Sequence, residues 1–311
     1  GMDFLAMTDH HNYAGSLEMI AAYAGVPLNM ALIPGEEVHL PHNAAHIISF
    51  GATHSVNAMV QTKRDELEER FPGIGQLPPE KWRGDPDAPC YSEAEYEAQV
   101  WALADTLDIP EGVDRFTVGA CVWAARQIRA AGGLSVFVHP YWINNTFSIP
   151  PKMSDLFFAQ NEFDAFEVFG GERYLEQNES QLIHYWEAKG RGTKLVPIGA
   201  SDSHSVYNNP DGYIGKTLVL SPRNERVSLI ESIRADKAPK SDADGVRKID
   251  VYPRGQDHKK KPVRNAEKAY LLNYGTSRIR GSHWIEEAEQ KALPTVQQVF
   301  EDIWDRHLKG G

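Results

Sequence analysis

The chain has 311 residues, of which 41% are hydrophobic and 24% charged, and its formal net charge is −11. This composition is typical of a soluble globular protein, and no apolar run approaches the roughly 20 residues of a membrane-spanning helix. The acidic balance argues against a nucleic-acid polymer as the main ligand. The two cysteines, Cys90 and Cys121, form no CxxC motif. Together with the lack of a signal peptide, they favour a reducing, cytoplasmic location.

The predicted elements alternate along the chain. Short apolar runs bounded by turn residues predict strands buried on both faces, at residues 3–10, 31–39, 45–51, 134–142, 165–171, 194–204 and 216–221. Helical patterns lie between them, at residues 16–25, 118–133, 174–190 and 226–237. Strand and helix in alternation indicate a mainly parallel α/β sheet or barrel.

Two regions depart from this alternation. Residues from about 53 to 118 combine Pro/Gly-rich loops with a helical pattern at 92–107, and we interpret them as an insertion that covers one end of the barrel as a lid. After residue 238 the sequence becomes polar and closes with a helical pattern at 295–308. We therefore predict a barrel domain at 1–238 and a C-terminal accessory segment at 239–311.

Residues able to bind a metal stand at the ends of nearly all the predicted strands. The carboxyl ends of the strands of a parallel barrel converge on one rim, so we expect these residues to meet in one pocket. Histidine with carboxylate suits zinc, manganese or iron better than calcium or magnesium, which prefer oxygen ligands almost throughout. The residues concerned are Asp9, His10, Glu37, His46, His139, Asp202 and His204.

Each of these residues, taken alone, has a structural alternative, because a histidine on a strand is more often hydrogen-bonded than metal-bound. The run Asp202-Ser203-His204 is a stronger signal, since alternate residues of a strand project to one face. The other histidines are predicted to have other roles: loop positions for His39, His42 and His54, helix packing for His184, and surface positions for His258, His283 and His307.

A series of motifs resembles the PHP family, which is named for polymerase and histidinol phosphatase. In order, the motifs are "FLAMTDHHN", "IPGEEVH" followed by "AHIISFG", "VFVHPYW", "DAFEVFGG" and "GASDSHS". The resemblance covers residues 2–237 without the insertion, and it is strongest to stand-alone metal-dependent phosphoesterases, including relatives of carbaryl hydrolase. It implies a distorted seven-stranded β/α barrel of the TIM-like kind, with two or three divalent metals (Mn, Zn or Fe) at the strand ends.

The resemblance implies a role for each matching residue. The match at Thr8-Asp9-His10 implies that His10 is a ligand and that Asp9 is its structural neighbour, outside the set of residues that bind the metal. Gly35-Glu36-Glu37 makes Glu37 the carboxylate that bridges the metals, while Glu36 points to the opposite face. The other implied ligands are His46, His139, Asp202 and His204, with Glu167 as a rim residue. Catalysis is expected to depend on Glu37 and Asp202.

The resemblance is incomplete at the beginning of the chain, where the family's first strand carries a His-x-His motif. We expect the barrel to lack this strand and to leave residues 3–10 as an exposed edge, covered by the tail or by a second copy in a homo-oligomer. The metal that His-x-His helps to hold is expected to be absent or weakly bound, because Glu37 and Asp202 alone would remain. The chain as given is therefore expected to be a weakened enzyme.

The implied activity is hydrolysis of a phosphate ester of a small metabolite or nucleotide by metal-activated water, without a serine or cysteine nucleophile. A carbamate or ester hydrolase of the same fold and a barrel without activity are the alternatives. Several residues beyond strand ends are candidates for lining the substrate opening, with loop turns and packing as the alternative: Tyr141, Trp142, Asn144, Asn145, Glu167, Asn208 and Asn209.

Overall fold

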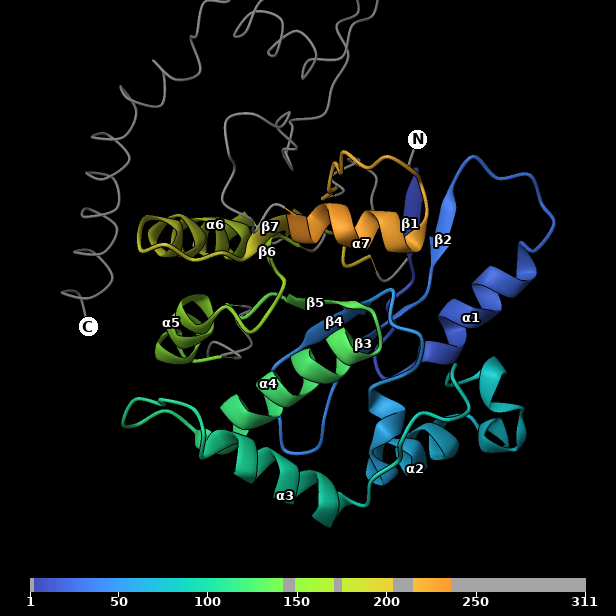
Figure 1. The fold of residues 1–311 in the computed structure, drawn as a ribbon, viewed down its shortest axis with the longest axis horizontal. Helices are drawn as coiled ribbons and strands as arrows, with labels where there is room; N and C mark the ends of the chain where they lie inside the picture. Colours follow the sequence, from blue (N-terminus) through green and yellow to red (C-terminus); the bar gives the residue numbers. More distant parts are fainter. Residues whose placement is uncertain (1–2, 142–148, 171–174, 204–214, 236–311) are drawn as a thin grey trace, which may run out of the picture. The chain divides into compact units, whose positions relative to one another are not determined.

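The computed structural model describes residues 3–141, 149–170, 175–203 and 215–235 (Figure 1). The strands are β1 (Phe4–Ala6), β2 (Ala31–Ile33), β3 (Gly35–Val38), β4 (Ile47–Phe50), β5 (Leu134–Phe137), β6 (Ala165–Phe169) and β7 (Val196–Gly199). The helices are α1 (Tyr13–Ala22), α2 (Gln61–Arg70), α3 (Glu93–Ala104), α4 (Arg115–Ala130), α5 (Pro151–Gln160), α6 (Leu175–Gly190) and α7 (Arg226–Ala235), with short 3-10 turns η1 (Asn57–Met59), η2 (Ile74–Gln76) and η3 (Pro79–Lys81). The fold is mixed α/β. Several predicted positions lie outside the described residues: Trp142, Asn144, Asn145, His204, Asn208, Asn209 and the segment 239–311.

Strands β2 and β3 form one extended segment that is interrupted at Pro34, which has no backbone N–H to donate. The β2 half pairs with β1 in parallel, and the β3 half pairs with β4 antiparallel. An isolated bridge between His10 and Glu37 continues the pairing on the β1 side. The other strands follow in chain order, with β4 and β5 antiparallel and with β5, β6 and β7 parallel.

The prediction of a mainly parallel sheet is wrong for β4, which runs antiparallel to both of its neighbours. Residues 39–46 join β3 to β4, and this connection is too short for the crossover that parallel neighbours require. Closure of the strands into a barrel, and the role of the insertion as a lid, stay predictions.

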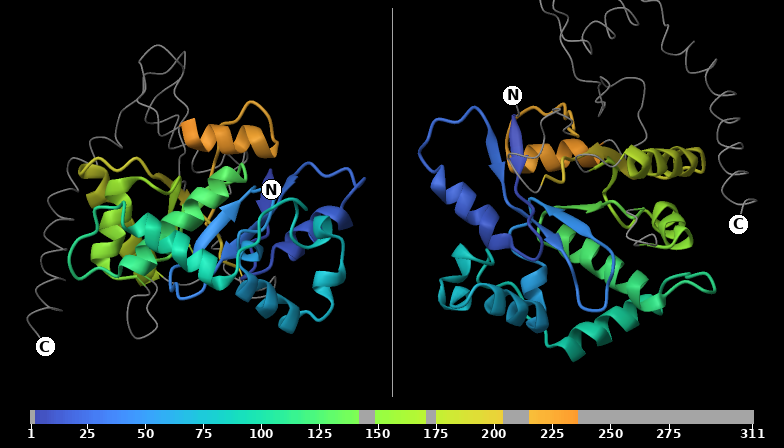
Figure 2. Two further views of the ribbon diagram at one scale, coloured as in Figure 1. Left: turned by 60° about the horizontal axis from the view of Figure 1, so that its bottom comes forward. Right: turned by 180° about the vertical axis from the view of Figure 1, so that it is seen from behind.

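The central strands are buried on both faces, as the continuous apolar runs predict. All four residues of β5 are buried. Because side chains alternate along a strand, Phe137 packs in the cluster that contains α4 and α5, while Val136 packs in a second cluster with Leu229 and Ile230 of α7. Helices α4 and α7 thus lie on opposite sides of the strands (Figures 1 and 2).

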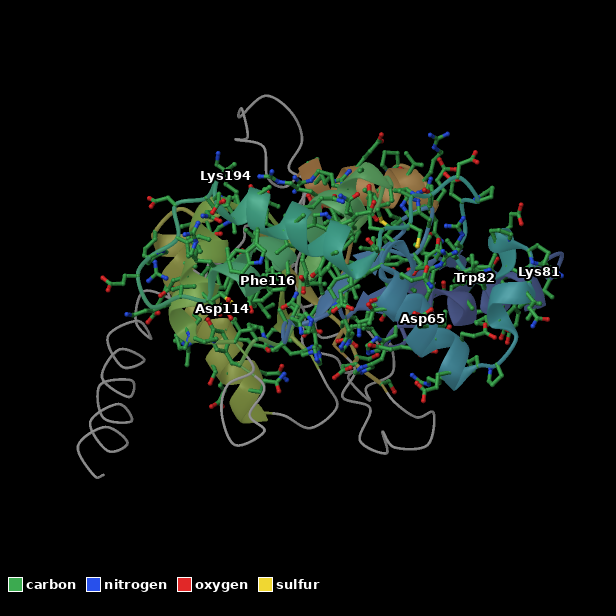
Figure 3. All side chains as sticks on the ribbon, turned by 90° about the horizontal axis from the view of Figure 1, so that it is seen from below. Asp65, Lys81, Trp82, Asp114, Phe116 and Lys194 are labelled. Carbon is green, nitrogen blue, oxygen red and sulfur yellow. The ribbon has the colours of Figure 1, made fainter. Side chains whose placement is uncertain are left out.

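The region of the insertion is attached to the rest of the fold through its own small core. Trp82, which is 4% exposed, packs with Ala14 of α1 and Leu67 of α2, and the Arg64 guanidinium lies 5.2 Å from the centre of its ring (Figure 3). Helix α3 begins with a capping box in which Ser92 and Glu95 satisfy each other's backbone N–H groups. Within the described ranges, no helix has the length and apolar character needed to cross a bilayer.

Candidate metal centre

The turn that follows β1 lies against β3. The backbone N–H of His11 donates to the carbonyl of Glu37 (3.1 Å), and the N–H of Glu37 donates to the carbonyl of Asp9 (3.1 Å). These two bonds fix the turn beside the strand. As a result, His10 Nε2 lies 3.1 Å from Glu37 Oε2.

Glu37 is the centre of a cluster of histidines. Its side chain is only 4% exposed, and its Oε1 lies 2.9 Å from His46 Nδ1, 3.3 Å from His139 Nε2 and 3.5 Å from His39 Nε2. Burial by itself would raise the pKa of this carboxyl. The contacts with His139, His39 and His46 outweigh burial and hold the pKa well below its ordinary value. Glu37 is therefore ionised at neutral pH.

The first group of potential ligands is Glu37, His46 and His139. They come from β3, from the residue before β4 and from the second residue after β5. His46 Nδ1 and His139 Nε2 are 2.9 Å apart, and all three potential ligand atoms lie within 4.8 Å of one another. Two imidazoles and one carboxylate at this spacing form a set that suits zinc, manganese or iron.

The second group is His10, Glu37 and His39, whose potential ligand atoms also lie within 4.8 Å of one another. The sequence prediction of His39 as a loop histidine is therefore incomplete: it follows β3 directly and joins the cluster. The signal was present in the sequence, because Glu37 and His39 are alternate residues of an extended segment and project to the same face. Glu37 belongs to both groups.

The unsatisfied atoms of the cluster fit bound metal ions. Glu37 Oε1, His39 Nε2 and His11 Nδ1 are buried and make no hydrogen bond of good geometry among the described residues, although Glu37 Oε1 lies 2.9 Å from His46 Nδ1 and His11 Nδ1 lies 3.7 Å from Glu66 Oε2. Leaving such groups unpaired is costly, and coordination of a cation is one of the few ways to satisfy a buried carboxylate and imidazole nitrogens together. The donor set therefore fits one ion at each group, with Glu37 shared.

Three of the five described non-glycine residues with positive φ follow strand ends, and the other two are His42 and Asn161. His11 (φ 55°), His139 (φ 27°) and Asp202 (φ 46°) all have the positive φ that residues with a side chain rarely adopt. Residues in such conformations are often found at functional sites, where the surrounding structure holds them. Asp202, a predicted ligand, is half-buried at the end of the segment that follows β7.

Glu36 faces away from the histidines, as strand alternation predicts. Its buried carboxylate accepts hydrogen bonds from Ser55 Oγ (2.7 Å), from Asn57 Nδ2 (3.0 Å) and from the backbone N–H groups of Val56 and Asn57. Burial raises its pKa to about 6 in spite of these bonds. Glu36 is thus an anchor between β3 and η1, on the side of the strand opposite to Glu37.

Three other predicted site residues lie in settings that differ from the expectation. Tyr141, proposed for the substrate opening, is 1% exposed and stacks on His184 of α6, with ring centres 4.3 Å apart. This contact confirms His184 as a packing residue. Glu167, proposed as a rim residue, is 2% exposed and lies behind His139. Asp9 has an exposed carboxylate beside Gly15, and its link to the cluster is its backbone carbonyl.

A third group of potential ligands joins His42, in the connection between β3 and β4, to two glutamates of α3. His42 Nε2 is 2.9 Å from Glu93 Oε1 and 3.7 Å from Glu97 Oε1. All three side chains are well exposed, and a solvated ion pair accounts for the arrangement.

No protein-family model and no curated protein matches the chain. Among solved structures, a two-domain protein from Bacteroides vulgatus that contains a predicted PHP-like metal-dependent phosphoesterase is 15% identical, with a TM-score of 0.41 over 76% of this chain and 54% of that one. A protein from Bifidobacterium adolescentis described as a metal-dependent phosphoesterase is 16% identical, with a TM-score of 0.37 over 70% of this chain and 82% of that one. An amidohydrolase from Chromobacterium violaceum, with bound sulfate and no metal, is 19% identical, with a TM-score of 0.38 over 75% and 86%.

The chain spans about half the length of the Bacteroides protein. The name of the first protein mentions the PHP family that the sequence motifs resemble, and none of the three names mentions a carbaryl hydrolase. At these identities and TM-scores the likeness assigns neither a fold nor an activity to this chain. The feature of this chain that bears on its function is the cluster of potential metal ligands around Glu37.

Proposed function

We propose that the protein is a metal-dependent hydrolase that acts on phosphate esters of small molecules. The observation that carries this proposal is the buried carboxylate of Glu37 between two groups of histidines, each of a size to hold a divalent ion. A divalent ion bound there would supply a water of lowered pKa and would polarise a phosphoryl oxygen.

The charge of the cluster favours an anionic substrate. The buried carboxylates that contact His139 of the cluster are Glu37 and Glu167. With Asp202 added, three carboxylates carry three negative charges against the four positive charges of two divalent ions, so the loaded centre with neutral water bound would be positive by one charge. A positive site surrounded by buried residues attracts a phosphate monoester more strongly than a neutral ester or carbamate.

The protein's own residues would prepare the centre before substrate arrives. Glu167 accepts a hydrogen bond from His139 Nδ1, which leaves His139 Nε2 directed toward Glu37. The hydrogen bonds between the His10 turn and β3 hold His10 on the other side of the same carboxylate. Glu37 is thereby fixed from both sides, as a shared ligand must be.

The test uses the full chain, stripped with a chelator and reloaded with Mn²⁺ or Zn²⁺. Phosphate release is measured on a panel of phosphate monoesters, and product release on matched carboxylic esters and carbamates. We expect phosphate release that disappears with the chelator and returns with the metal. Cleavage of carbamates without release of phosphate would instead identify the alternative hydrolase, and loaded protein that cleaves neither panel would identify a barrel without activity.

Glu37→Gln is the matching variant, because it keeps the shape of the side chain and removes the charge that two ions would share. We expect it to lower the rate by more than about 100-fold. Glu80→Gln, at an exposed position in η3, is the control with the same chemical change and should leave the rate unaltered. An unchanged rate in Glu37→Gln would place catalysis elsewhere.

A further inference from the structure

His39 lies outside the residues to which the family resemblance gives a role, yet it occupies a position that a structural histidine does not explain. Its ring is largely buried, with 14% of the side chain exposed, and its Nε2 has no hydrogen-bond partner among the described residues. A buried imidazole nitrogen without a partner loses the hydrogen bonds it had in water. Glu37 Oε1 lies 3.5 Å from this nitrogen, which is longer than an ordinary hydrogen bond and leaves room for an ion between the two atoms.

The position of the ring is fixed from several directions. Asn57 Oδ1 accepts a hydrogen bond from the backbone N–H of His39 (2.9 Å), which holds the chain where β3 ends. The ring centre lies 4.4 Å from that of His11, 4.7 Å from that of His10 and 4.2 Å from that of His46. A ring packed against three others has little freedom to turn away. His39 is thus preorganised to present Nε2 to the cluster.

The two oxygens of Glu37 face different partners. Oε2 lies 3.1 Å from His10 Nε2, whereas Oε1 lies 2.9 Å from His46 Nδ1, 3.3 Å from His139 Nε2 and 3.5 Å from His39 Nε2. Ligand atoms about 2.0–2.2 Å from a tetrahedral zinc ion are roughly 3.3–3.5 Å apart. The spacings around the carboxylate are close to this value, and the ligand atoms of His10, Glu37 and His39 lie within 4.8 Å of one another, so the Glu37 carboxylate is placed to be shared by an ion at each group.

We propose that His39 is a ligand, with His10 and Glu37, of a second divalent metal ion that shares the Glu37 carboxylate with an ion at His46 and His139. The inference builds on the metal centre of the proposed function and gives it a specific ligand set. The site of the second ion then has three protein ligands: Glu37 from β3, His39 directly after it, and His10 from the turn after β1. Three ligands are enough to hold a divalent ion firmly.

The test is a count of bound metal in the full chain. Zn²⁺ is titrated into chelator-stripped protein, the bound zinc is measured by elemental analysis after gel filtration, and affinity is measured by competition with a chromophoric chelator. We expect two tight equivalents in the wild type, one in His39→Gln and one in His46→Gln. His54→Gln, outside both groups, is the control and should keep two. Zinc that is lost in His42→Gln belongs to the exposed third group and is counted separately.

A spectroscopic measurement on the unaltered protein covers the case in which a variant does not fold. Two Mn²⁺ ions that share one carboxylate are close enough for their spins to couple, so wild-type protein with two equivalents should give the electron paramagnetic resonance signal of a coupled pair. A signal from isolated Mn²⁺ only, or two tight zinc equivalents retained by folded His39→Gln, would overturn the proposal. Coupled ions without any phosphate release would leave this inference in place and refute the proposed function.

Discussion

Glu167 and His139 form a buried pair in which one carboxylate oxygen holds both ends of the histidine. Glu167 Oε2 accepts a hydrogen bond from His139 Nδ1 (3.1 Å) and another from its backbone N–H (3.0 Å). Burial disfavours the charged imidazole, but the contacts with Glu167 and Glu37 outweigh it and raise the pKa of His139 to about 10. The pair therefore sets both the orientation and the charge of a predicted ligand.

Glu167→Gln should lower the affinity for Zn²⁺ by about 10–100-fold, the usual effect of removing a carboxylate that supports a metal-bound histidine. The amide has no charge to hold the Nδ1 proton, and only its oxygen can accept from the two N–H groups of His139. Competition with a chromophoric chelator measures the change. Glu179→Gln, an exposed position on α6, is the matched control. Equal affinity in wild type and Glu167→Gln would mean that the contact serves packing alone.

Gly170→Ala should disturb the pair of Glu167 and His139 through a steric overlap with Glu167. A Cβ at this position would overlap the carboxyl group of Glu167, which is buried and hydrogen-bonded to His139. Overpacking of this kind costs roughly 1–3 kcal/mol of unfolding free energy, and here it should also weaken metal binding because Glu167 must move. Gly190→Ala is the control, since a Cβ there meets nothing within 4 Å. Chemical denaturation and zinc titration report the two effects separately, and wild-type values for both would contradict the prediction.

The pKa of His139 predicts how the stability of the metal-free protein depends on pH. Because the folded state raises this pKa from 6.5 to about 10, the protonated histidine contributes stability that is fully present below pH 6.5 and is lost as the pH rises toward 10. In the presence of a chelator, wild type should therefore exceed His139→Gln in Tm most clearly at about pH 6.5 and below. The difference should shrink between pH 7 and 10, and a difference that does not vary with pH would contradict this account.

The sequence predicted the parts of the fold that depend on local pattern. The apolar run at residues 134–142 predicts a strand buried on both faces, and β5 is buried along its whole length. Alternation along β3 predicts that Glu36 and Glu37 face opposite ways, and Glu36 does contact Ser55 while Glu37 contacts histidines. These predictions succeed because side-chain direction in a strand is a property of the backbone.

The wrong predictions concern how deeply a side chain is buried and which residues contact it. A local sequence pattern carries neither kind of information. Glu167 and Tyr141 were expected to contact substrate at strand ends, but Glu167 lies in the middle of β6 and both side chains are buried. The antiparallel direction of β4 depends on the short connection from β3. His39 was different, because the alternation that places it beside Glu37 was already legible in the sequence.

Asn57 offers a test of whether the backbone around Glu37 positions the second group of ligands. Its side-chain amide donates to Glu36 Oε2 (3.0 Å) and to the carbonyl of Glu37 (3.0 Å), and its carbonyl oxygen accepts from the N–H of His39 (2.9 Å). Asn57→Ala removes these three bonds. Glu36 Oε2 keeps its bond from Ser55 Oγ, and the Glu37 carbonyl keeps its bond from the His11 N–H. The His39 N–H is therefore the group that loses its partner. We expect a loss of unfolding free energy of roughly 1–3 kcal/mol from this unpaired group.

The same variant should weaken one of the two tight zinc equivalents more than the other, because His39 loses its backbone tether while His46 and His139 keep their contacts. Chelator competition resolves the two affinities, and denaturation of the stripped protein gives the stability. Ser92→Ala removes the capping box of α3 at a cost of about 1 kcal/mol and contacts neither group, so it shows what destabilisation alone does to metal binding. If Asn57→Ala and Ser92→Ala have the same two zinc affinities, the position of His39 does not depend on Asn57, and the stack of imidazole rings must be sufficient to hold it.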